Sequence, residues 1–178
     1  MERNVPPRAA TFVLLDPEGY TLNFTTVRAL SKFRTAPRKV ELMILVDTGS
    51  VFRTGRAEIQ GQSGPTRLSW ALPFNWRELL EAYESGDLDV DQARTEIAER
   101  YRASVRGLGY KHVLARPITR GLRDGAAVYH LVFATDNDAG ERIMRMAFDR
   151  VYVNEGRRRR ADGGPRPGEP IQGRLDLS

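Results

Sequence analysis

The chain of 178 residues is long enough to bury the core of one domain, and its 40% hydrophobic and 29% charged residues are typical of a soluble globular protein rather than a disordered chain. Its 28 Lys and Arg residues against 23 Asp and Glu residues give a net charge of +5, which fits either a solvated arginine-rich surface or a polyanionic partner. The absence of cysteine excludes disulfides, thiolate nucleophiles and cysteine-based zinc sites.

No feature of the sequence places it in a membrane. No apolar run approaches the roughly 20 residues that span a bilayer. The first residues, MERNVPPRAA, lack the apolar core of a signal peptide. We therefore expect a cytoplasmic protein without a membrane partner. The histidines, His112 and His130, stand far apart in the sequence, and we predict no metal site.

The first predicted element is a strand at Phe12 to Leu15, where four apolar residues follow one another. A strand with two apolar faces is typical of an interior parallel strand that helices cover on both sides. Such a strand needs two neighbours, yet only residues 1–11 precede it, and the prolines and charges of residues 1–10 predict a disordered segment. We therefore interpret the chain as the second half of an α/β domain.

A helix and a second strand follow. Asn23 can cap a helix that Pro37 ends, and the mostly apolar segment 40–46 is the next strand, which ends at Asp47. A strand, a helix and a strand in this order form a βαβ unit, so the two strands are predicted to be parallel neighbours.

Residues 48–72 are predicted to form a long loop with at most a short helix, because they contain several glycines and little periodicity. Arg53 and Arg56 would then lie at the same end of the sheet as Asp16 and Asp47. There the two arginines could bind a phosphate, or they could remain solvated. Asp47 fits either a polar contact with a ligand or a turn.

The remaining predicted elements are two helices, two strands joined by a hairpin, and a short last helix. Their bounds are Asn75 to Gly86, Asp87 or Asp89 to Gly107, His112 to Ile118, a turn at 122–125, Val128 to Ala134, and a short helix capped by Thr135 or Asp136. The domain is therefore expected to cover residues 11–153. Residues 154–178 are basic and rich in Gly and Pro, and we predict a disordered tail; its Arg157 to Arg160 run suits either nucleic-acid binding or solubility.

This order of elements resembles the C-terminal half of a Rossmann-like methyltransferase, in which a hairpin inserts an antiparallel last strand. Three segments are similar to the three-Cys-motif partner (TcmP) family: residues 12–20, FVLLDPEGY; the strand at 40–46; and residues 129–140, YHLVFATDNDAG, before Ile143-Met144. The similarity covers about residues 10–150. The expected fold is α/β, a partial methyltransferase sheet that is mainly parallel with an antiparallel last strand.

The resemblance implies a candidate catalytic site at Asp16, Pro17 and Tyr20. This segment is similar to the Asp-Pro-Pro-Tyr motif of amino-group methyltransferases, in which the acidic side chain or the turn carbonyls hold the target amine and the tyrosine stacks on a base. The other interpretation of DPEGY is a turn, with Pro at its second position and Asp16 accepting local hydrogen bonds. Glu18 also departs from the family, which tends to have an aromatic residue there.

The sequence lacks the half that would bind the methyl donor. Its Gly61-to-Gly64 and Gly107-to-Gly109 segments do not follow a strand and open a helix, so neither predicts a nucleotide site. S-adenosylmethionine is therefore expected as a cofactor only if a missing N-terminal half is supplied. The resemblance implies a cysteine-motif partner protein and, with the basic charge, a nucleic-acid substrate. Asp47, Arg53 and Arg56 are the candidate substrate-binding residues.

Three hypotheses remain open from the sequence. The chain is an incomplete methyltransferase-like protein that acts with a partner, a non-enzymatic module that binds nucleic acid or protein, or a degenerate frame that folds poorly. The first two share one physical expectation. The strand at Phe12 to Leu15 has a neighbour on one side only, so its free edge should make the isolated chain an oligomer, a partner-bound subunit or prone to aggregation.

Overall fold

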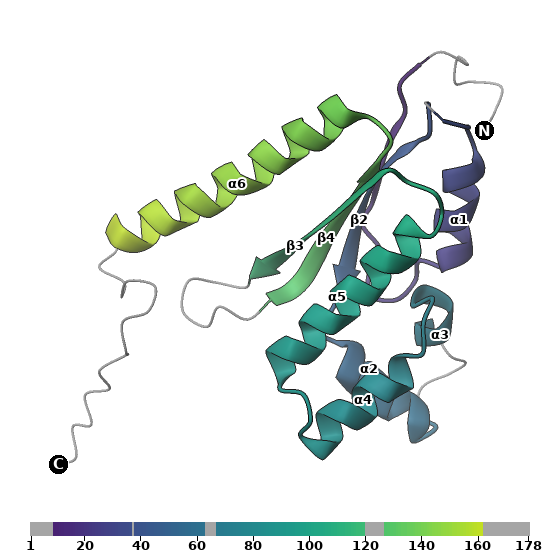
Figure 1. Cartoon of the computed structure of the whole chain (residues 1–178). Helices are drawn as coiled ribbons and strands as arrows, with labels where there is room; N and C mark the ends of the chain where they lie inside the picture. The colour runs from purple at the N-terminus through teal and green to yellow at the C-terminus, as the bar shows by residue number, and fades with distance from the viewer. Residues whose placement is uncertain (1–8, 37, 63–66, 120–126, 162–178) are drawn as a thin grey trace.

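The computed structural model describes residues 9–36, 38–62, 67–119 and 127–161 (Figure 1). The predictions for Pro37, for the hairpin turn at 122–125, for residues 1–8 and for residues 162–178 lie outside this range. The described elements, in chain order, are β1 (Phe12–Leu15), α1 (Phe24–Lys32), β2 (Glu41–Asp47), α2 (Val51–Ile59), α3 (Arg67–Ala71), α4 (Trp76–Ser85), α5 (Val90–Arg106), β3 (His112–Thr119), β4 (Ala127–Thr135) and α6 (Asp138–Ala161).

The protein is α/β, and its sheet has the strand order β1-β2-β4-β3. β1 and β2 are parallel, with Val13 opposite Leu42, and β4 is antiparallel to both β2 and β3. The parallel first pair and the antiparallel last strand are therefore confirmed. The expectation of a mainly parallel sheet is wrong, because β4 lies between β2 and β3 and makes both of its pairings antiparallel.

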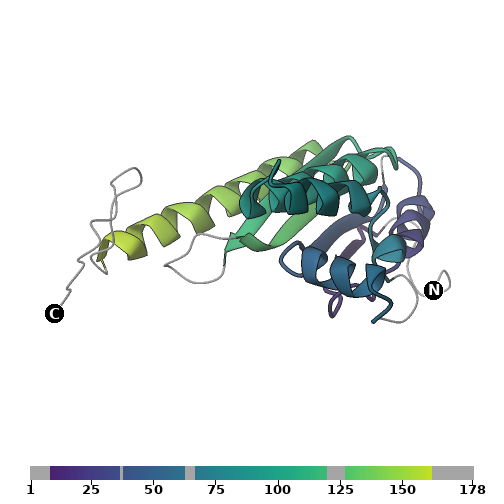
Figure 2. The same ribbon diagram turned by 90° about the horizontal axis from the view of Figure 1, so that it is seen from below.

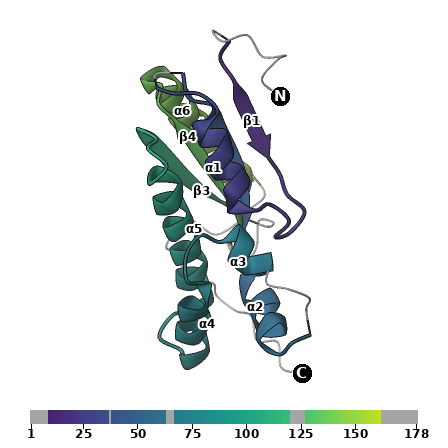
Figure 3. The ribbon, with the colours of Figure 1, turned by 90° about the vertical axis from the view of Figure 1, so that its right-hand side faces the viewer.

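Helices cover the two faces of the sheet unequally (Figures 1 and 3). α1 and α5 lie on one face, with α2, α3 and α4 continuing from its lower end, and α6 lies on the other face. The main core fills the space between the first face and its helices. Alternate residues of β2 enter this core, as the pleat of a strand requires: Leu42, Ile44 and Val46 are buried.

The helix ends follow the capping residues of the sequence. The side chains of Asn23 and Asn75 accept hydrogen bonds from the first turns of α1 and α4, and Asp89 forms a capping box with Gln92 at the start of α5. Gly86 ends α4 at φ +84°, a left-handed conformation that glycine adopts without strain. These caps are where the sequence predicts them.

The predicted loop at 48–72 is wrong, because the segment contains helices α2 and α3. Gly55 lies in the middle of α2, where glycine ordinarily weakens a helix. Here it allows close packing, since a Cβ atom at this position would lie 2.8 Å from the ring of Trp76 on α4. Phe52 also packs against Tyr83 of α4, with ring centroids 4.6 Å apart. Tertiary packing therefore stabilises a helix that its own composition does not favour.

β1 is an exposed edge strand rather than an interior one. Phe12 and Leu14 are 50% and 58% exposed, whereas Val13 and Leu15 pack against the core. The expectation of two dry faces is wrong because α6 contacts β3 and β4, at the far side of the sheet from β1. The predicted free edge of β1 agrees with the strand order, in which β1 is terminal.

The last helix is longer than predicted. Asn137 caps it by accepting a hydrogen bond from Ala139 N at 2.9 Å, while Thr135 accepts one from Asn137 N, so the cap lies just after the predicted positions. α6 begins on the sheet and then projects away from it (Figures 1 and 2). It continues to Ala161, so residue 154, the predicted start of the disordered tail, lies inside a helix.

Candidate functional site

The carboxyl ends of β1 and β2 meet at one edge of the sheet, because the two strands are parallel. Asp16 follows β1, and Asp47 is the last residue of β2. The Tyr20 hydroxyl donates a hydrogen bond of 2.6 Å to the Asp47 carbonyl oxygen. The structure thus brings the Asp16-to-Tyr20 turn and Asp47 together, as the sequence predicts.

The carboxylate of Asp47 organises the start of α2. It accepts hydrogen bonds from the backbone nitrogens of Gly49 and Ser50, each at 3.0 Å, and another from the Ser50 hydroxyl. These bonds satisfy donors at the N-terminus of the helix, which otherwise lack intrahelical partners. The geometry therefore fits the turn interpretation of Asp47, in which its oxygens serve the fold.

Tyr20 also has a structural position. Its hydroxyl lies between the Asp47 carbonyl and the Ser50 hydroxyl, which is 3.5 Å away. Burial raises the pKa of Tyr20 far above its ordinary value, so the group remains protonated and continues to donate its hydrogen bond at physiological pH. The adjoining cavity, which Pro17, Tyr20 and Asp47 line, holds about 20 Å³, room for about one water molecule.

The two candidate arginines lie on α2 rather than in a loop, and they point to different places. Arg53 is exposed, and its positive charge acts on the Tyr20 hydroxyl, so it belongs to the carboxyl edge. Arg56 forms an ion pair of 2.7 Å with Glu84 on α4 and lies over the Tyr83 ring. The structure therefore brings Arg53, but not Arg56, to the predicted site. Asp16 is exposed at the same edge, and Pro17 is partly buried.

Removing the Tyr20 hydroxyl tests this architecture. Tyr20→Phe is expected to lower the free energy of unfolding by about 1–2 kcal/mol, because it leaves the Asp47 carbonyl without its donor. Tyr83→Phe is the matched control, since the Tyr83 ring packs on Phe52 and its substitution keeps that contact. Urea denaturation measures both variants. Equal stability of Tyr20→Phe and the wild type would show that this hydrogen bond does not hold the edge together.

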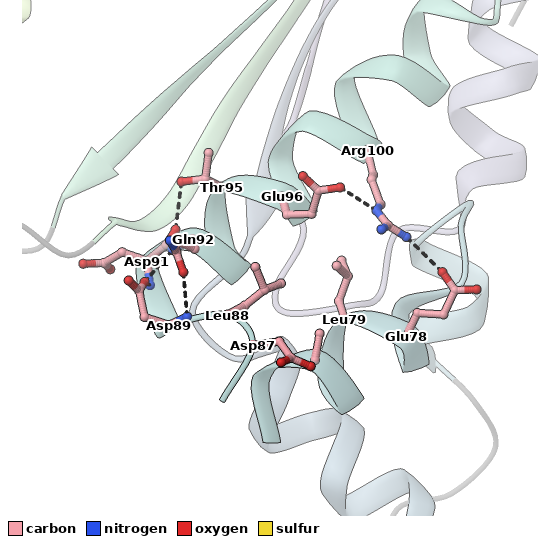
Figure 4. A pocket seen from close by; sticks show the side chains of 11 residues that line it. Glu78, Leu79, Asp87, Leu88, Asp89, Asp91, Gln92, Thr95, Glu96 and Arg100 are labelled. Atoms are coloured by element: carbon pink, nitrogen blue, oxygen red, sulfur yellow. Dashed lines mark hydrogen bonds and ion pairs between the residues drawn. The ribbon is translucent and has the colours of Figure 1, made fainter. Parts of the chain in front are cut away.

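An open groove of about 800 Å³ lies between α4 and α5 (Figure 4). Leu79 and Leu88 point into it, and Arg100 on α5 bonds to Glu96 at 2.8 Å and to Glu78 at 3.3 Å. The groove is strongly acidic, and the sequence analysis missed it, although the closely spaced aspartates before α5 were a visible signal. Its acidic lining residues are Glu78, Asp87, Asp89, Asp91 and Glu96.

The second unusual surface is the sheet face that α6 only partly covers. The strand register puts Leu14 and Met43 on this face, and Tyr129 and Ile118 lie opposite each other near its other end. Phe12, Leu14, Ile118 and Tyr129 are all exposed large apolar residues. The face adjoins the outer edge of β1, which pairs with no other strand among the described residues, so apolar side chains and free backbone groups occur together.

The described helices include none that is long and apolar enough to cross a membrane. Within the same part of the chain, no three His, Asp or Glu residues are grouped so that they could hold a metal ion. Searches with the sequence and the structure found no matching protein-family model, no matching curated protein and no matching solved structure.

Proposed function

We propose that this chain is a methyltransferase-related subunit of the TcmP type, whose sheet is completed along β1 by another polypeptide. Strand direction supports the proposal. β1, β2 and β3 run in one direction, and β4 runs in the other direction between β2 and β3. This arrangement resembles the C-terminal half of a Rossmann-like methyltransferase, where a hairpin inserts the antiparallel last strand.

The observation that carries the proposal is the position of β1. Its sequence, FVLL, is that of an interior strand, yet Phe12 and Leu14 are 50% and 58% exposed at the edge of the sheet. Fully burying a large apolar side chain contributes about 1.5–3 kcal/mol, so covering these two residues is strongly favourable. A strand that adds to this edge also pairs the free backbone groups of β1.

In this proposal, two of the predicted site residues contact the substrate and three others stabilise the fold. Asp16, exposed beside Pro17, is the group that holds an acceptor amine, and Arg53 contacts the phosphate of a nucleic-acid substrate. Tyr20 and Asp47 support the edge through their hydrogen bond rather than by stacking on a base. Arg56 stabilises the α2–α4 contact through Glu84.

A non-enzymatic protein-binding module is the second candidate, and one observation favours it. The cavity beside Pro17, Tyr20 and Asp47 holds about 20 Å³, far below the roughly 300–1,000 Å³ of ligand pockets. In this alternative the β1 edge still recruits a polypeptide, but the complex carries out no methyl transfer.

Titration calorimetry with S-adenosylmethionine separates these functions. The isolated chain is expected to give no binding heat, because neither of its glycine-rich segments, at 61–64 and 107–109, follows a strand and opens a helix. Micromolar binding by the isolated chain would contradict the proposal. The titration is then repeated on the complex that the wild-type chain forms with another polypeptide and that the Leu14→Pro variant does not form. Its result decides the function. Donor binding by that complex supports the methyltransferase-related subunit, and its absence supports the binding module.

A further inference from the structure

The outer edge of β1 is complementary to a second copy of the same strand. In Figure 3, β1 lies at the margin of the sheet, and among the described residues it pairs only with β2. The Thr11 carbonyl faces β2, because it accepts a hydrogen bond of 2.9 Å from Glu41 N. Backbone groups alternate in direction along a strand, so the N–H and C=O groups of Phe12 and Leu14 face outward. The edge therefore offers two residues, each with a donor and an acceptor.

Only one antiparallel two-fold arrangement pairs these two residues with each other. Opposite residues of an antiparallel pair exchange two hydrogen bonds when the backbone groups of both face the partner strand. With the two-fold axis at Val13, Phe12 lies opposite Leu14 of the second copy, and Leu14 lies opposite Phe12 of the second copy. An axis at Phe12 or at Leu14 would instead place the other residue opposite position 10 or 16, outside the strand. The axis at Val13 therefore satisfies the outward groups of both residues.

The same arrangement covers the apolar side chains of the edge. Phe12 and Leu14 are both exposed, and they lie on the same, partly open face of the sheet. Residues directly opposite in an antiparallel pair have Cβ atoms about 4.5–5.5 Å apart, so each Phe12 ring packs against Leu14 of the other copy. Each copy thus removes the apolar side chains of the other from water, which favours association.

The charges at the two ends of β1 favour an antiparallel copy over a parallel one. Asp16 is exposed and follows the carboxyl end of β1. Arg34 lies at the other end, where its guanidinium donates a hydrogen bond to the Ala9 carbonyl oxygen. With the axis at Val13, Asp16 lies opposite position 10 of the second copy, next to the carbonyl that binds Arg34, so opposite charges approach each other. A parallel copy would place the Asp16 carboxylates of the two copies side by side.

We propose that the isolated chain forms a symmetric dimer in which β1 pairs antiparallel with β1 of a second copy, with the two-fold axis at Val13. The inference rests on the proposed function, because it uses the edge at which another polypeptide completes the sheet. One edge holds only one strand, so the dimer has to dissociate before that polypeptide docks. The dimer is therefore a resting form that protects the free edge.

The chain contains no cysteine, so single cysteines introduced into β1 report the pairing directly. With oxidised glutathione, Val13→Cys is expected to give a disulfide-linked dimer of twice 20.1 kDa, because the axis places this residue opposite its own copy. Leu15→Cys is the matched control, since Leu15 and Val13 both pack against the core but Leu15 lies opposite position 11 of the second copy. It is expected to give no cross-link. Equal cross-linking of the two variants would overturn the pairing.

An NMR measurement on the wild type covers the case in which Val13→Cys perturbs the fold. In dimers of one isotope-labelled and one unlabelled copy, filtered NOE spectra are expected to connect the Phe12 ring with Leu14 methyl groups of the other copy. Absence of these contacts in the associated chain would overturn the dimer. Both tests concern the second copy alone, whereas the complex with another polypeptide decides the proposed function. A cross-linked chain that forms no such complex would contradict the proposed function and keep the dimer.

Discussion

Leu14→Pro is expected to convert a self-associating chain into a monomer of 20.1 kDa, whereas Val13→Pro is expected to destabilise the fold. The difference comes from the direction of backbone groups along β1. The carbonyl of Thr11 accepts a hydrogen bond of 2.9 Å from Glu41 N, so Thr11 faces β2. Backbone groups alternate between the two sides of a strand, so those of Val13 also face β2 and those of Phe12 and Leu14 face the free edge.

Proline removes one N–H group and therefore has opposite consequences at these adjacent positions. At Leu14 it removes an outward donor, which edge strands tolerate but which a docking strand needs. At Val13 it removes a hydrogen bond to β2 and leaves the acceptor without its donor, which is expected to cost about 1–3 kcal/mol. Leu14→Ala, which keeps the N–H group, separates the contribution of the side chain from that of the backbone.

Light scattering on purified protein measures the association state of the wild type and Leu14→Pro, and thermal unfolding measures the stability of Val13→Pro. The wild-type chain is expected to show a molar mass above 20.1 kDa that falls on dilution. A wild type with the monomer mass, or a Leu14→Pro variant that associates as the wild type does, would contradict a docking role for the β1 edge.

The second large effect concerns the two faces of the sheet. Leu42→Ala is expected to destabilise the protein by about 2–5 kcal/mol, because Leu42 is fully buried on the face that α1 and α5 cover. Met43→Ala, one residue away, is expected to cost about 1 kcal/mol, because Met43 lies on the partly open face.

Chemical denaturation of the two variants gives this comparison directly. If Met43→Ala is as costly as Leu42→Ala in the monomer, the second face is packed as tightly as the first, and the sheet is not open. In an assembled form, the cost of Met43→Ala should rise, because an occupant of the open face would then bury the side chain.

The sequence predicted those parts of the fold that local signals determine. Asn23, Asn75 and Asp89 mark helix starts through their own side-chain hydrogen bonds, and short apolar runs mark all four strands. Prediction from the sequence failed where contacts between residues far apart in the chain determine the structure. Gly55 weakens α2 locally, but its contact with Trp76 is visible only in three dimensions. The exposure of Phe12 and Leu14 on the face of the sheet could not be foreseen either, because an apolar run does not show whether anything covers it.

The residues of the candidate site likewise divide into those that the sequence placed correctly and those whose positions depend on packing. Parallel strands bring Tyr20 and Asp47 to one edge, which the order of elements was sufficient to predict. The ion pair that takes Arg56 away to Glu84 depends on how α2 packs on α4, and α2 itself was not predicted. His130 lies on an apolar strand, and its hydrogen bond to the Thr48 hydroxyl shows a packed, buried histidine.

Amide hydrogen exchange along β1 tests the central claim, docking at a free edge, most directly. In dilute, dissociated protein, the amides of Val13 and Leu15 are expected to be protected by β2, and those of Phe12 and Leu14 to exchange freely. On assembly, the Phe12 and Leu14 amides should become protected while their neighbours change little. If Phe12 and Leu14 exchange equally fast in the assembled and the dissociated protein, no strand docks on this edge, and the proposed completion of the sheet is wrong.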